Sequence, residues 1–133
     1  MTRPVVRLSD SLRSQIIDHC RKALPNEGCG LIASDDQGEV VAVYLTANLD
    51  QSPTGYTVPP NEHHKALLEA ECHGWVLSGV FHSHPKGSAK PSMVDVESAL
   101  EPEWLYLVVG LSGTPAIRGW RIRRSEIEEI SLI

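Results

Sequence analysis

The sequence lacks the features that mark membrane, secreted and disulfide-rich proteins. No run of about 18 apolar residues occurs in the 133 residues, so we expect no membrane-spanning helix. The N-terminal Met-Thr-Arg-Pro has none of the apolar core of a signal peptide. The three cysteines (Cys20, Cys29 and Cys72) are an odd number at wide spacings, which argues against a disulfide framework. These absences predict a cytoplasmic protein.

Positive charge and aromatic residues are also scarce. The 12 Lys and Arg are outnumbered by 17 Asp and Glu, which gives a net charge of −5. Because affinity for a phosphate backbone depends on excess cationic charge, we expect no nucleic-acid partner. Aromatic residues make up 5% of the chain, and their spacing is typical of core positions rather than of a base-stacking platform. At about 150 residues per domain, the chain is predicted to be a single domain over residues 1–133.

Apolar spacing, β-branched runs and turn residues predict a mixed α/β fold. The first helix is expected to begin near Ser9 or Ser11 and to end near Ala23. Two more helices are predicted at 61–73 and 92–100, and strands at 29–33, 39–47, 75–81, 105–111 and 116–122, with a further short element at 126–133. This order of elements predicts one sheet flanked by helices, and the antiparallel hairpins at both ends argue against a doubly wound fold.

The most informative segment is His82-Ser83-His84-Pro85. Seven residues separate His84 from Ser92, and Asp95 lies three positions after Ser92. In a strand, residues two apart face the same side, about 6.6 Å apart along the backbone, so both imidazoles can reach one metal ion. Pro85 ends that strand, and Ser92 opens the helix that carries Asp95 in its first turn. Two His nitrogens and one carboxylate oxygen leave one tetrahedral position for water, as in catalytic zinc sites.

Each part of this pattern also has an ordinary explanation. A lone His-x-His is usually incidental, and Ser-x-x-Asp before an apolar run is a helix-capping pattern. It is their close succession after a buried strand that favours a metal site. A metal hydrolase also needs a general base, and Glu27 in Asn26-Glu27-Gly28-Cys29-Gly30 is the best candidate, although a Glu in a turn is often only a surface residue.

These residues resemble the JAMM motif of MPN-domain zinc metalloproteases, which consists of an upstream Glu, His-x-His-Pro and Ser-x-x-Asp. Glu27, His82, His84, Ser92 and Asp95 match every position, and the likeness covers nearly the whole chain. The resemblance implies the MPN fold, a cytidine-deaminase-like α/β fold with one mixed sheet flanked by helices.

The resemblance also implies a role for each matching residue. His82, His84 and Asp95 would bind one zinc ion per chain, with water as the fourth ligand. Glu27 would take the proton of that water and pass it to the leaving amine. Ser92 would hydrogen-bond the oxyanion of the tetrahedral intermediate. The bond cut would be a peptide or isopeptide bond at the C-terminal tail of a ubiquitin-like protein.

Within the family, the chain is similar to the bacterial Mec-like branch, through residues 27–31, 48–53 and 101–103. That likeness implies hydrolysis after the C-terminal glycine of a ubiquitin-like sulfur-carrier protein, with release of an amino acid such as cysteine or of a short peptide. One alternative is a deubiquitinase-like isopeptidase that removes ubiquitin-like modifiers from lysine. The sequence does not give the carrier or the oligomeric state.

Two other classes of function fit these residues less well. A non-catalytic MPN scaffold or binding module would be expected to lack some ligands, whereas all of them are present here. A zinc deaminase would need Cys-x-x-Cys, which this sequence does not contain. The metallohydrolase interpretation is therefore favoured.

Overall fold

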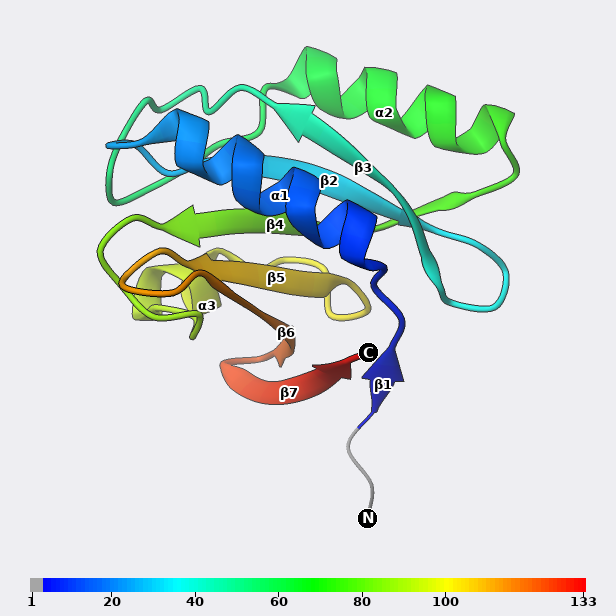
Figure 1. Cartoon of the computed structure of the whole chain (residues 1–133). Coiled ribbons are helices and arrows are strands. Elements are labelled where there is room, and N and C mark those ends of the chain that lie inside the picture. The colour runs from blue at the N-terminus through cyan, green and yellow to red at the C-terminus, as the bar shows by residue number, and fades with distance from the viewer. Residues whose placement is uncertain (1–3) are drawn as a thin grey trace.

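The computed structural model describes residues 4–133 and contains one seven-stranded sheet with three helices (Figure 1). The strand order is β1-β7-β6-β5-β4-β2-β3. The pairs β4–β5 and β1–β7 are parallel, and the remaining neighbours are antiparallel. The sheet is thus mixed, with antiparallel hairpins on both sides, and the predicted fold class is confirmed.

The elements follow the chain in a simple alternation. They are β1 (Val5–Val6), α1 (Asp10–Ala23), β2 (Cys29–Ser34), β3 (Val40–Thr46), α2 (Pro60–Cys72), β4 (Val76–His84), α3 (Met93–Ser98), β5 (Leu105–Gly110), β6 (Ala116–Arg123) and β7 (Glu126–Leu132).

Helix α1 covers one face of the sheet, and α2 and α3 cover the other. Ile16 and Cys20 of α1 are buried against Phe81 of β4, because apolar residues four apart form one stripe on a helix. On the opposite face, Ala66 and Ala70 of α2 pack with the side chains of β2 and β4. Alternation along β4 therefore sends Phe81 towards α1 and its neighbours Val80 and His82 towards the α2 and α3 face.

Three elements differ most from the sequence-based expectation. Helix α3 ends at Ser98 rather than near residue 100, since Ala99 already has an extended backbone with ψ of 111°. Strand β4 runs to His84, beyond the predicted range 75–81, but it ends directly before Pro85 with both histidines in the strand, as the His-x-His-Pro pattern predicted. Strand β1 was not predicted, and its two residues pair with Ser131 and Leu132 at the far end of the chain.

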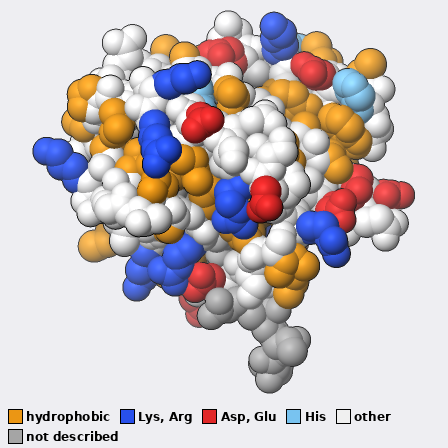
Figure 2. All heavy atoms as spheres, viewed as in Figure 1, with side chains coloured by type: hydrophobic (Ala, Val, Ile, Leu, Met, Phe, Trp, Pro, Cys, Tyr) orange, Lys and Arg blue, Asp and Glu red, His pale blue; other side chains and the backbone are white. Residues whose placement is uncertain are grey.

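The start of the chain, the helices and the surface add three observations. Part of the Met-Thr-Arg-Pro segment, residues 1–3, lies outside the described residues. Within residues 4–133, each helix is too short or too polar to cross a lipid bilayer. On the face seen in Figure 2, basic and acidic side chains are interspersed.

Candidate metal centre and catalytic cleft

The two predicted histidine ligands lie at the carboxyl end of β4, inside the sheet. His82 pairs with Cys29 of β2 on one side and with Val108 of β5 on the other, and its side chain is 2% exposed. His84 is the last residue of the strand and is partly buried. The two Nε2 atoms lie 3.2 Å apart, as expected for i and i+2 residues that share one face.

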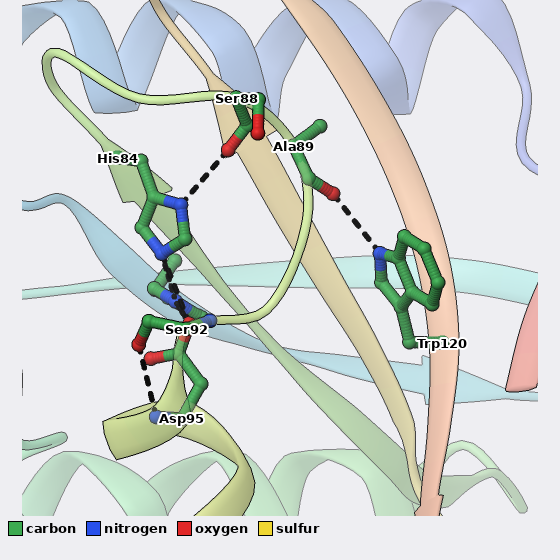
Figure 3. A network of polar contacts seen from close by, with 7 residues as sticks. His84, Ser88, Ala89, Ser92, Asp95 and Trp120 are labelled. Carbon is green, nitrogen blue, oxygen red and sulfur yellow. Dashed lines mark hydrogen bonds and ion pairs between the residues drawn. The ribbon is translucent and has the colours of Figure 1, made fainter. Parts of the chain in front are cut away.

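Asp95 reaches the same point from the first turn of α3. The Ser92 hydroxyl accepts from the Asp95 backbone N–H at 3.1 Å, and the Ser92 N–H donates to Asp95 Oδ2 at 2.8 Å, so the two residues form a capping box (Figure 3). The cap aims the carboxylate at β4, where Oδ2 lies 3.0 Å from Nε2 of both His82 and His84. The capping and metal-site interpretations of Ser-x-x-Asp therefore describe one geometry.

The protonation of these groups fits a cation between them. The Ser88 carbonyl can only accept, so His84 Nδ1, at 2.8 Å, carries the proton and a neutral His84 turns a lone pair on Nε2 towards Asp95 Oδ2. The His84 lone pair and the Asp95 carboxylate are both acceptors, so at 3.0 Å they need a proton or a metal ion between them. Ligand atoms about 2.0–2.1 Å from a tetrahedral zinc would be about 3.3 Å apart, close to the separations found here. His82, His84 and Asp95 form a group that could hold a metal ion.

Electrostatics within this group favour an ionised Asp95. Burial alone would raise the pKa of Asp95, but hydrogen bonds from His82 and His84, together with that from the Ser92 backbone, hold it well below its usual range. The same hydrogen bond to Asp95 raises the pKa of His84. A metal ion would take the place of the proton in this interaction, since a metal ligand must present a lone pair.

Glu27 lies in the turn between α1 and β2 and is 5% exposed. Its backbone is fixed on three sides: the Glu27 N–H donates to Ser52 O at 2.8 Å, Asn48 Nδ2 donates to Glu27 O at 3.0 Å, and the next N–H donates to the buried Ser83 hydroxyl at 2.9 Å. Burial raises the pKa of Glu27 to about 7, although nearby His84 acts in the opposite direction. Glu27 Oε1 accepts no hydrogen bond from residues 4–133.

A cleft of about 250 Å³ lies between Glu27 and the candidate metal centre, and Ser92 also lines it. Glu27, His84 and Ser92 all line it, and residues 53–54 and 85–87 complete its walls. Ser92 is exposed there, and among the described residues its hydroxyl donates no hydrogen bond, so its proton is free for a ligand. Three of the five predicted site residues thus line this cleft, and the other two, His82 and Asp95, contact His84 at its wall.

Several supporting residues were missed by the sequence analysis. Tyr56 stacks on the His82 ring with centroids 4.5 Å apart, and Ser83, the middle residue of His-x-His, is buried and accepts from Gly28. His19 of α1 donates from Nε2 to Cys29 O at 3.1 Å and to Thr46 O at 2.9 Å. Each contact joins distant parts of the chain. Only the period-two position of Ser83, on the face opposite the histidines, was a signal present in the sequence.

Comparison with known proteins gives a consistent result. Residues 9–123 match the family model described as prokaryotic homologs of the JAB domain. The chain is 30% identical to a desampylase of Haloferax volcanii, covering 99% of this chain and 98% of that protein. It is 35% identical to a probable TtuB-protein conjugate cleaving protease of Thermus thermophilus (86% and 73% covered) and 29% identical to the CysO-cysteine peptidase of Mycobacterium tuberculosis (79% and 73% covered).

Solved structures agree on the fold. A protein of Desulfitobacterium hafniense superimposes with a TM-score of 0.89 at 34% identity, covering 97% of this chain and 92% of the other. A JAB1/MPN domain protein of Archaeoglobus fulgidus superimposes with a TM-score of 0.60 at 14% identity, covering the whole of both chains. The predicted MPN fold is thereby confirmed.

Proposed function

Because the chain belongs to the family of prokaryotic homologs of the JAB domain, we propose that it is a zinc-dependent peptidase that hydrolyses the bond after the C-terminal glycine of a ubiquitin-like protein. It is an enzyme of the JAMM metalloprotease class, as the peptidase, protease and desampylase names of its relatives indicate. The observation that carries the proposal is the convergence of His82 Nε2, His84 Nε2 and Asp95 Oδ2 beside the buried carboxyl of Glu27.

His82, His84 and Asp95 would hold the zinc. Bound there, zinc would lower the pKa of a water molecule and polarise the scissile carbonyl. Glu27 acts as general base and takes the proton of the attacking water. A base whose pKa lies near 7 also returns that proton readily to the leaving amine, because its two protonation states are close in free energy at neutral pH.

The Ser92 hydroxyl donates a hydrogen bond to the carbonyl oxygen of the substrate, which becomes negatively charged as the carbonyl is attacked. Its position is fixed before substrate arrives, because the hydroxyl oxygen already accepts from the Asp95 N–H. Preorganised donors of this kind stabilise the transition state without reorientation. The cap of α3 therefore serves both the helix and the reaction.

The leaving group distinguishes two versions of the proposal. The CysO-cysteine peptidase, by its name, acts on a linkage to cysteine. This name supports release of a single amino acid, which we retain as the primary proposal. The second candidate is cleavage of a lysine isopeptide. It is favoured by the desampylase, which aligns over nearly its full length, and by the conjugate-cleaving protease.

One experiment tests both versions. Purified protein with zinc is incubated with ubiquitin-like carriers that bear either cysteine after Gly-Gly or a lysine isopeptide, and the products are weighed by mass spectrometry. The proposal expects a carrier that ends at Gly-Gly, from at least one substrate class, and no product after chelation. A zinc-loaded protein that cleaves neither class would instead indicate a binding module.

A further inference from the structure

Of the two histidines at the candidate metal centre, His84 alone has a partner among residues 4–133 for its second ring nitrogen. His82 Nδ1 is buried without a hydrogen-bond partner among residues 4–133, whereas His84 Nδ1 donates to Ser88 O at 2.8 Å. Such contacts set the tautomer and the orientation of a metal-binding imidazole. The position of the Ser88 carbonyl therefore determines where the lone pair of His84 Nε2 points.

Ser88 lies in the irregular loop 85–92, which is anchored to the sheet one residue further on. Ala89 is 4% exposed, and its carbonyl accepts a hydrogen bond from the indole N–H of Trp120 at 3.0 Å (Figure 3). The loop also lies flat on β5, since a Cβ at Gly110 would be 2.7 Å from Ala89 N and 2.8 Å from Ser88 C. The strands β5 and β6 thus hold the backbone that orients His84.

Trp120 is itself immobilised. It is 5% exposed on β6, and the Arg118 guanidinium carbon lies 4.7 Å from the centre of its ring. Arg118 in turn makes a two-pronged contact with Glu129 of β7, at 2.6 and 2.9 Å. A buried indole with the Arg118 guanidinium over its ring presents its N–H at one point, so the loop is hydrogen-bonded to a fixed position in the sheet.

We propose that Trp120 is a positioning residue for the metal ligand His84, acting through its hydrogen bond to Ala89 O and the adjacent Ser88 carbonyl. Loss of the indole N–H leaves a buried carbonyl without a donor, which favours movement of the loop towards water. The Ser88 carbonyl moves with it and releases the His84 ring. The metal readout below rests on the proposed zinc function, while the tautomer readout does not.

The test compares Trp120→Phe with Trp75→Phe, which removes a partly buried indole next to the opposite end of β4. Zinc dissociation constants are measured by competition with a chromophoric chelator. We expect Trp120→Phe to bind zinc about 10-fold more weakly, as is typical when a contact behind a ligand is lost, and Trp75→Phe to match the parent protein. Equal effects of the two variants, or no effect of Trp120→Phe, would overturn the proposal.

A second measurement reads the His84 ring directly. In metal-free protein at a pH where the ring is neutral, long-range proton–nitrogen NMR should show the proton on Nδ1 in the parent and a mixture of tautomers in Trp120→Phe. If Trp120→Phe does not fold, Gly110→Ala displaces the same loop from the β5 side and should have the same two effects. A parent that shows these signals but cleaves no carrier contradicts the proposed function only. An active Trp120→Phe with unchanged zinc affinity and tautomer contradicts the positioning role only.

Discussion

At the scale of single residues, the Glu27 carboxyl combines burial with closeness to the candidate metal centre. Removal from water raises its pKa to about 7, and His84 opposes this shift. A dication at the nearby centre would act in the same direction as His84 and lower the pKa further. The protonation state of Glu27 therefore changes at or below neutral pH.

The first prediction concerns pH. Because Glu27 must be ionised to accept a proton, kcat/KM should fall as pH drops through the pKa of Glu27, at or below about 7, and should level off above it. Zinc content is measured at each pH, because protons also compete with metal for His84, whose pKa is raised by its hydrogen bond to Asp95. A fully zinc-loaded enzyme whose rate is constant from pH 8 to pH 5 would contradict the general-base role.

The second prediction separates the two functions of Ser92. Ser92→Ala should lower kcat about 10²- to 10³-fold through loss of an oxyanion donor, and should destabilise the protein by about 1 kcal/mol through loss of the α3 cap. Ser98→Ala, at the exposed last residue of the same helix, should change neither quantity. Rates and urea unfolding measure the two effects, and a fully active Ser92→Ala would exclude the oxyanion role.

At the scale of elements, close contact between strands depends on glycine at a few positions. Gly79 of β4 packs against β5 so closely that a Cβ there would overlap the carbonyl oxygen of Leu105. Backbone cannot move aside as a flexible side chain can. The central pair β4–β5, which carries both histidines at its carboxyl end, is therefore sensitive to a single methyl group.

The third prediction follows from this contact. Gly79→Ala should destabilise the fold by about 1–3 kcal/mol or more, measured by urea unfolding, because inserted volume forces the backbone apart. Gly55→Ala is the matched control, since its Cβ would meet nothing closer than 3.8 Å. Equal stability of the two variants would show that the strand pair adapts more easily than its geometry indicates.

Elements that are determined by residues close together in the sequence could be predicted, whereas elements that depend on distant contacts could not. The α1 stripe through Ile16 and Cys20, and the capping box at Ser92, are determined within one or two helical turns, so the sequence predicted them. Strand β1 has two residues and forms only because the C-terminal strand lies beside it. The Trp120–Ala89 hydrogen bond joins residues 31 positions apart, so no local sequence pattern predicts it.

At the scale of the whole molecule, the site exists only when distant segments meet. The Gly28 N–H binds the Ser83 hydroxyl across 55 positions of sequence, and this contact places Glu27 beside the end of β4. The JAMM resemblance predicted which residues gather there, although local patterns could not supply the distances. A ligand that binds the assembled centre and not the unfolded chain must also stabilise the fold.

The most direct test of the account is the effect of Glu27→Gln on zinc content and on cleavage, measured on the same preparation. The amide keeps the size of the side chain but cannot take a proton, so zinc should remain at about one per chain while cleavage of a carrier extended beyond Gly-Gly falls by about 10²-fold or more. Glu97→Gln, on the exposed face of α3, is the control that should keep both. A Glu27→Gln protein that cleaves the carrier at the parent rate would contradict the central claim.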